Sequence, residues 1–177
     1  MIRGFSMKKL ILIIIILLIS SALFAQNEGA VTFHNFAWGT SIDAFKARVG
    51  NPLLVENTGG FQSLLYENVS WAGHRAFMIA YFSQNGLEGG MYYFNTIGLE
   101  EMMKCYNSVQ KELVTFFGPT PPAPAGRYEE LMREMRAYES CWMLPTGYIH
   151  LKVNTRTGDP VTLWISFPAL TAILDGA

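Results

Sequence analysis

An Asn85-Gly86 pair between two apolar runs is the feature that most constrains the fold of this 177-residue chain. The two runs cover residues 75–82 and 87–94. Asn-Gly between such runs favours a type I′ turn, because both central residues of that turn need a positive φ. A Gly89-Gly90 pair inside the second run predicts a bulge or a close approach. With a further strand at 61–67, we expect an antiparallel meander of three or four strands.

Helical periodicity occurs before and after this meander. Residues 42–49 carry apolar residues at helical spacing, follow the potential N-caps Thr40 and Ser41, and precede Gly50 and Pro52. Residues 99–117 form a longer amphipathic pattern that ends at Gly118-Pro119. The remaining predicted segments are an extended connector at 120–126, a short helix at 127–136, strands at 137–144, 148–153 and 161–167, and a terminal helix or frayed tail at 169–177.

The predicted order is therefore helix, meander, helix, meander. Single helices separated by runs of strands are typical of an α+β fold, whereas a parallel sheet would alternate strand and helix. We expect a two-layer α+β domain in which helices pack on antiparallel meander sheets. The repeated order also suggests a tandem α-β-β-β unit, with one copy at 31–97 and the other at 98–168.

The first 25 residues have the three parts of a secretory signal peptide. Arg3, Lys8 and Lys9 precede ten consecutive Leu and Ile residues at 10–19, and a less apolar segment at 20–25 ends in the small residue Ala25. The apolar run is shorter than the roughly 20 residues that span a bilayer. We predict cleavage after residue 25 and a single exported domain at 26–177, in the periplasm or secreted. Two alternatives stay open, namely translation from Met7 and an uncleaved N-terminal membrane anchor.

Charge limits the partners of the exported part. The chain has 13 basic and 14 acidic residues, and the signal contains three basic residues and no acidic one, which leaves a net charge of about −4. Nucleic-acid binding is disfavoured because it depends on basic patches that neutralise phosphates. We also expect no stable membrane span after cleavage.

The sequence contains no motif for catalysis or for a cofactor. His34, His74 and His150 are isolated in sequence, no Gly-x-Ser-x-Gly elbow or phosphate-binding loop occurs, and we expect neither a metal site nor a bound cofactor. The two cysteines, Cys105 and Cys141, are candidates for a disulfide in an oxidising compartment. Two buried free thiols are the alternative, because spacing alone does not supply the Cα separation that a disulfide needs.

Aromatic residues on the predicted strands provide the candidate binding surface. Alternation along 148–153 and 161–167 puts aliphatic residues on one face and Tyr148, His150 and Trp164 on the other. Tyr and Trp are enriched at interface hot spots, so these three residues form a candidate partner-binding face. Loops or the terminal tail could equally cover that face. The strand at 75–82 is apolar on both faces, which predicts burial by a helix on one side and by the other half of the chain or a partner on the other.

The segment from Trp38 to Pro52 carries a family resemblance. A Gly with a following Ser/Thr cap, an apolar helix and a Gly-x-Pro stop resemble the opening helix of the SmpA/OmlA-type outer-membrane assembly lipoproteins. Their α+β fold is related to that of the β-lactamase inhibitor protein. This chain lacks the cysteine that bears the lipid in those lipoproteins. The resemblance implies an exported scaffold that binds other proteins, and it transfers no catalytic residue.

These observations predict a non-catalytic protein-binding or scaffold module of the bacterial cell envelope, whose partner is another envelope or secreted protein. A small-molecule or lipid carrier that uses an apolar sheet face as one wall of its pocket is the alternative.

Overall fold

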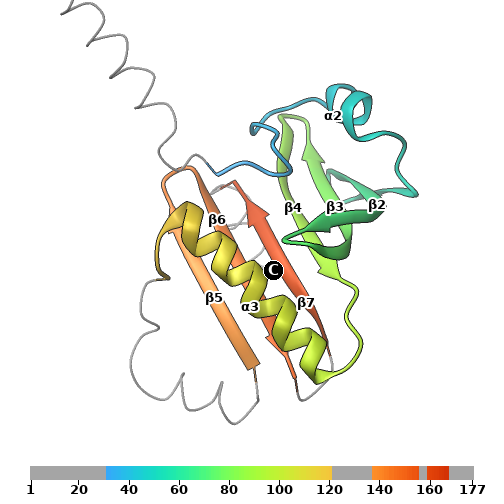
Figure 1. Ribbon diagram of the computed structural model, residues 1–177. Helices are drawn as coiled ribbons and strands as arrows, with labels where there is room; N and C mark the ends of the chain where they lie inside the picture. Colours follow the sequence, from blue (N-terminus) through green and yellow to red (C-terminus); the bar gives the residue numbers. More distant parts are fainter. Residues whose placement is uncertain (1–30, 121–136, 156–158, 168–177) are drawn as a thin grey trace, which may run out of the picture. The chain divides into compact units, whose positions relative to one another are not determined.

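The strands of the computed structural model, which describes residues 31–120, 137–155 and 159–167, form one seven-stranded antiparallel sheet (Figure 1). The strand order is β1-β2-β3-β4-β7-β6-β5. The strands are β1 (Leu54–Thr58), β2 (Phe61–Trp71), β3 (His74–Ser83), β4 (Gly86–Phe94), β5 (Ala137–Leu144), β6 (Gly147–Asn154) and β7 (Asp159–Ser166). The signal at 1–25, the helix at 127–136, the tail at 169–177 and residues 121–126 of the connector lie outside the described residues.

The Asn85-Gly86 turn connects β3 to β4 as predicted. Gly86 has a φ of 95°, and a Cβ placed on it would lie 2.4 Å from the backbone oxygen of Gly39. The chain approaches so closely here because Leu87 donates its N–H to the carbonyl of Thr40 and accepts from the N–H of Gly39. A glycine is therefore required at position 86 both for the turn and for the approach of this segment.

The predicted close approach at Gly89-Gly90 also occurs. A Cβ on Gly90 would lie 2.1 Å from the ring of Phe33, so the missing side chain leaves room for that ring against the sheet. The ring centroid of Phe33 lies 5.2 Å from that of Tyr92, and both residues are buried. The register of this hairpin shifts between Tyr81 and Phe82, and the extra residue is Glu88 on β4, next to Gly89.

The short helix α2 (Ile42–Val49) has the predicted bounds and cap. Ser41 Oγ accepts a hydrogen bond from the Ala44 N–H at 3.3 Å, and Gly50 ends the helix. Phe45 is fully buried and packs on the rings of Phe36, Tyr66 and Phe82. These contacts place α2 on the face of the sheet to which Tyr66 belongs.

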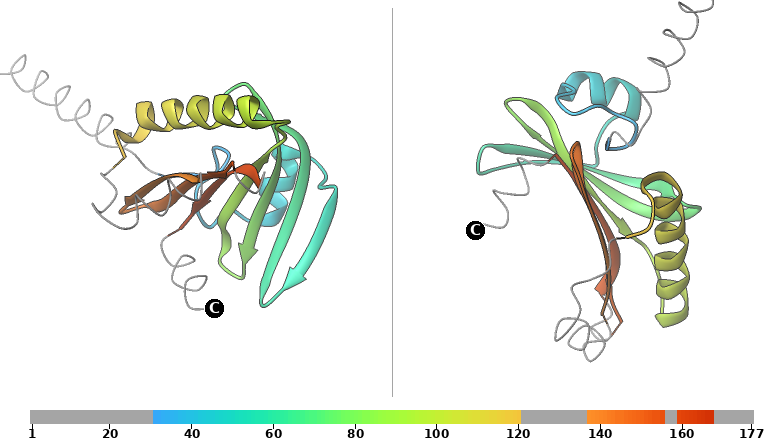
Figure 2. Two further views of the ribbon diagram at one scale, coloured as in Figure 1. Left: turned by 90° about the horizontal axis from the view of Figure 1, so that it is seen from below. Right: turned by 90° about the vertical axis from the view of Figure 1, so that its left-hand side faces the viewer.

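The long helix α3 (Leu99–Phe117) also has the predicted bounds, and it lies along β5, β6 and β7 (Figure 2). Its buried stripe consists of Met102, Cys105, Tyr106, Val109 and Leu113. Three polar contacts fix it to β5. The Tyr106 hydroxyl lies 2.8 Å from Ser140 Oγ, Gln110 Nε2 donates to the same oxygen at 2.8 Å, and Trp142 Nε1 donates to the Gly118 carbonyl at 3.0 Å. The helix therefore packs on the face to which Ser140 and Trp142 belong.

Strand register shows that both helices share one face. Residues that pair across neighbouring strands form rows across the sheet. One row begins at Ser140 on β5 and ends at Tyr66 on β2, and it includes the side chains against which α3 and α2 pack. The next row on the same face consists of Trp142, Ile149, Ile165, Gly90, Ala80 and Leu64. We call this the covered face, and nearly all of its residues are buried. The opposite side, here the open face, carries Phe77, Ile79, Tyr81, Gly89, Met91, Tyr93, Glu139, Cys141, Met143, Tyr148, His150, Lys152, Thr162, Trp164 and Ser166.

The two-layer α+β fold class is thus confirmed, but the described residues show no tandem repeat. The first helix has 8 residues and precedes four strands, whereas the second has 19 and precedes three. The two meanders join edge to edge through β4 and β7 into one sheet. Strand β1 was not predicted, since its five residues are all exposed and give no alternating pattern.

Candidate functional site

The open face brings the three predicted surface residues together. His150 on β6 pairs directly with Trp164 on β7, and Tyr148 lies two residues along the same strand, with ring centroids of Tyr148 and His150 5.9 Å apart. All three side chains are partly buried. The structure therefore places Tyr148, His150 and Trp164 on the face opposite the helices, where the alternating pattern predicted them.

Aromatic side chains of the first meander continue this surface. Trp164 pairs with Met91, and the ring of Trp164 lies 5.2 Å from the ring of Tyr81. Phe77 is 40% exposed, and Tyr93 is half-buried. Burial, with Tyr93 and Glu56 nearby, raises the pKa of Tyr81 to about 12, so its hydroxyl is neutral at physiological pH. The centre of the open face is thus largely aromatic, with the Glu56 carboxylate near Tyr81.

A polar cluster lies at the β5–β6 end of the same face. Glu139 and Cys141 alternate along β5, and His150 is the cross-strand partner of Cys141. Cys141 Sγ lies 3.9 Å from Glu139 Oε1 and 3.7 Å from the Tyr148 hydroxyl, and Glu139 Oε1 contacts His150 Nε2. Burial raises the pKa of the Cys141 thiol; Glu139 raises it further, and the hydrogen bond with Tyr148 opposes the shift.

The two cysteines are free thiols in this structure, so the disulfide between Cys105 and Cys141 is not formed. Cys105 is buried in the stripe of α3 against the covered face, whereas Cys141 belongs to the open face. Burial, with Glu101 nearby, raises the pKa of the Cys105 thiol to about 12. The sheet separates the two thiols, which a spacing of 36 residues in sequence does not reveal.

Glu139 and the cluster around Cys141 were missed by sequence reasoning, which treated each histidine and cysteine as isolated. The feature of the sequence that could have revealed this cluster is the turn between β5 and β6. Leu144 pairs with Gly147, so the loop has two residues, and that length fixes the register that sets Cys141 opposite His150. Counting back two residues along β5 places Glu139 on the same face.

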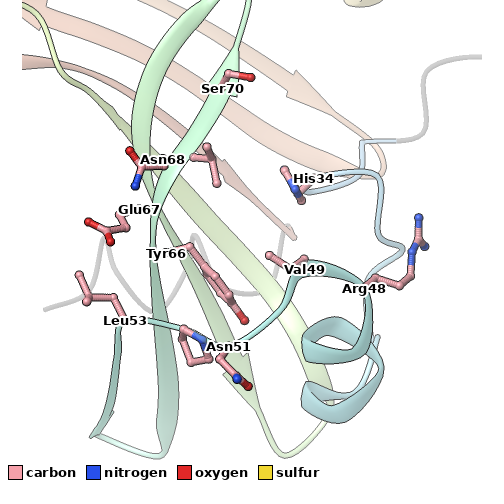
Figure 3. Close-up of a pocket in the computed structure, with 11 residues that line it drawn as sticks. His34, Arg48, Val49, Asn51, Leu53, Tyr66, Glu67, Asn68 and Ser70 are labelled. Atoms are coloured by element: carbon pink, nitrogen blue, oxygen red, sulfur yellow. The ribbon is translucent and has the colours of Figure 1, made fainter.

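A second site candidate is a depression of about 610 Å³ between α2 and β2 (Figure 3). Its lining is largely polar and includes His34, Arg48, Asn51 and Asn68. Tyr66 also lines it, and Figure 3 shows this side chain reaching from β2 toward α2. The Tyr66 hydroxyl is shielded from solvent and has no hydrogen-bond partner among the described residues. An unpaired buried hydroxyl is costly, so a bound polar group would satisfy it.

Two further residues that line this depression, His34 and Arg48, contact neighbouring aromatic side chains. His34 Nδ1 lies 3.0 Å from the Tyr92 hydroxyl, and burial together with the Arg48 guanidinium lowers the pKa of His34. The guanidinium carbon of Arg48 lies 4.5 Å from the ring centroid of Phe36. The Arg48 cation, the Glu67 carboxylate and the Tyr66 phenol all line this depression, which favours a small polar molecule over a lipid.

No protein-family model and no curated protein matches this chain. A solved structure that it is similar to is that of an extracellular protein containing a SCP domain from Bacillus anthracis, with 11% sequence identity and a TM-score of 0.46. The alignment covers 81% of this chain and 48% of that one, so this chain spans about half the length of its neighbour.

The resemblance to the SmpA/OmlA-type lipoproteins, based on the segment from Trp38 to Pro52, was therefore wrong. A capped helix that stops at glycine and proline is common to many folds, so this short segment does not identify a family. Within the described ranges, no helix combines the length and the apolar character that crossing a bilayer requires.

Proposed function

We propose that the protein is an exported, non-catalytic module that binds another envelope or secreted protein through the open face of its sheet. The signal-like residues 1–25 support export to the periplasm or the medium, and an N-terminal anchor is the alternative if that segment is retained. The aromatic side chains of the open face supply contact area with few rotatable bonds, which suits them to an interface rather than to a reaction.

One observation carries the proposal. Strand β3 is apolar on both faces. From the sequence, two alternatives could cover its outer face, namely the second half of the chain or a partner. The second meander continues the sheet through β4 and β7 and, in the described residues, does not lie over that face. Both helices of the described part of the chain pack on the covered face. Phe77, Tyr81 and Trp164 thus form an aromatic surface that suits a partner protein.

The test is a Trp164→Ala variant of the full exported chain, used to capture partners from the source cell's envelope fraction. Because the side chain is partly exposed, we expect unchanged far-UV circular dichroism and loss of a partner that wild-type protein retains. The matched control is Phe116→Ala, which removes an aromatic ring that is 65% exposed on α3. That variant keeps the partner if the interface is on the open face.

Binding must then be reproduced with the purified partner. A loss of affinity in Trp164→Ala but not in Phe116→Ala supports the proposal. Equal affinity of both variants, or unfolding of Trp164→Ala, contradicts it, since the first outcome places the interface elsewhere and the second makes Trp164 a core residue.

A small-molecule carrier is the second candidate, and the unpartnered Tyr66 hydroxyl in the depression beside α2 favours it. A volume of about 610 Å³ lies within the range of ordinary ligand pockets, roughly 300–1,000 Å³. Native mass spectrometry of protein purified from its source cell would detect a bound molecule. Its loss in Tyr66→Phe, with retention in Trp164→Ala, would support the carrier.

A further inference from the structure

Three side chains with metal-binding atoms converge on the β5–β6 hairpin. Glu139, Cys141 and His150 each offer one atom, and these three atoms all lie within 4.8 Å of one another. The residues come from facing positions of two paired strands, so the backbone register holds them together. All three are partly buried, which removes part of the water that would otherwise separate them.

The closest contact inside the cluster joins its imidazole and its carboxylate. His150 Nε2 is shielded from solvent and pairs with Glu139 Oε1. Cys141 Sγ faces the same carboxylate at 3.9 Å. A nitrogen, a sulfur and an oxygen thus point into one small volume.

We infer that Glu139, Cys141 and His150 form a binding site for a zinc ion. Thiolate, imidazole and carboxylate are the zinc ligands of proteins, with bonds of about 2.0–2.3 Å that place ligand atoms roughly 3.3–3.8 Å apart. Side-chain movements of about 1 Å bring the three atoms to that spacing. Calcium and magnesium are disfavoured because they take oxygen ligands. A tetrahedral ion keeps its fourth position for water.

The surroundings fit this assignment. The Tyr148 hydroxyl lies 3.7 Å from Cys141 Sγ and orients the thiol from the adjacent strand position. Cys105 lies on the opposite side of the sheet and does not compete for Cys141 in this structure. The site does not depend on the proposed partner, because all three ligands belong to this chain.

The experiment is a zinc titration of the purified full exported chain, reduced and freed of metal, in competition with a chromogenic chelator. We expect one zinc ion per chain. Cys141→Ser, His150→Gln and Glu139→Gln should each weaken binding by at least about tenfold, since removing even a residue that only orients a ligand costs about 10–100-fold. Cobalt in place of zinc should give a thiolate-to-cobalt charge-transfer band that Cys141→Ser abolishes.

Cys105→Ser and His74→Gln are the matched controls, as each removes one thiol or imidazole outside the cluster. Both should keep wild-type affinity, and Cys105→Ser should keep the cobalt band. Absence of stoichiometric binding to the wild-type chain overturns the inference, as does unchanged affinity in Cys141→Ser. Circular dichroism checks the folding of each variant. If another variant unfolds, the zinc affinity of Glu139→Gln, the mildest change, is the test, and an unchanged affinity of this variant contradicts the site. Because no partner is present, failure here leaves the test of the open face untouched.

Discussion

Individual residues in this protein have properties that only the folded environment sets. His34 has a φ of 52°, a conformation that few residue types other than glycine tolerate. Its ring is partly buried beside the Arg48 guanidinium, and both effects lower its pKa below the usual value of 6.5. Sequence spacing showed neither the depression that His34 lines nor the contact of His150 with Glu139.

The pKa of His34 predicts a pH dependence of stability. Because the folded state disfavours the protonated ring, the unfolded chain binds the proton more readily near pH 6.5. The contribution of His34 is therefore complete above pH 6.5 and is lost as the pH falls through the lowered pKa of the folded state. Urea unfolding from pH 8 to pH 5 should show this decline in the free energy of unfolding.

His34→Asn is the matching variant, since asparagine tolerates a positive φ and does not titrate. Its free energy of unfolding should fall less steeply below pH 6.5 than that of the wild type. Parallel profiles for the two proteins would show that His34 does not contribute.

At the scale of elements, the anchoring of α3 depends on β5. The buried Trp142, 1% exposed, fills the space beneath the end of α3, and its indole N–H satisfies the carbonyl of Gly118. Helix ends leave carbonyls unpaired, so this bond caps the helix from the sheet. The helix is thereby fixed at its C-terminal end, close to residue 120, where this described segment ends.

Two substitutions at Trp142 separate packing from the hydrogen bond. Trp142→Ala should lower the free energy of unfolding by about 3–5 kcal/mol, and Trp142→Phe, which keeps a ring, should cost less. Trp164→Ala on the other face should cost clearly less than Trp142→Ala, because its side chain is only partly buried. Chemical denaturation measures all three, and equal costs for Trp142→Ala and Trp164→Ala would contradict the assignment of faces.

The elements themselves were predictable where the pattern is local. The helices at 42–49 and 99–117 have apolar periodicity and clear stops, and the strand at 137–144 was predicted at its observed bounds. Strand β2 extends beyond the predicted 61–67 because a bulge between Tyr66 and Val69, with Asn68 at a φ of 58°, allows pairing to resume. The pairing of β4 with β7 joins distant segments, and no local signal specifies it.

The candidate site was predictable in part for the same reason. Alternation placed Tyr148, His150 and Trp164 on one face, which the register of β6 and β7 shows. The contribution of Tyr81 and Met91 depends on the β4–β7 pairing and could not be found from either half alone. The cluster of Glu139, Cys141 and His150 could have been predicted from the register of the β5–β6 hairpin alone. Assuming a two-residue turn between the two strands gives that register.

In the whole molecule, the described residues from 31 to 167 form one unit with an asymmetric sheet. Both described helices pack on the covered face, and aromatic and sulfur-containing side chains occupy the open face. A partner that buries this surface would give the further layer that strand β3, which is apolar on both faces, needs. Export and the zinc site are separate proposals, and neither is required for the open face to bind.

Side-chain footprinting of the free, full exported chain tests whether the open face is exposed, because the sheet holds matched residues on its two faces. Met91 and Trp164 on the open face should be modified readily, whereas Met78 and Trp142, at 0% and 1% exposed, should be protected. Mass spectrometry of the modified peptides gives all four rates in one experiment. If Met91 and Trp164 react as slowly as Met78 and Trp142, the open face is covered in the free protein and is not a surface that a partner can bind.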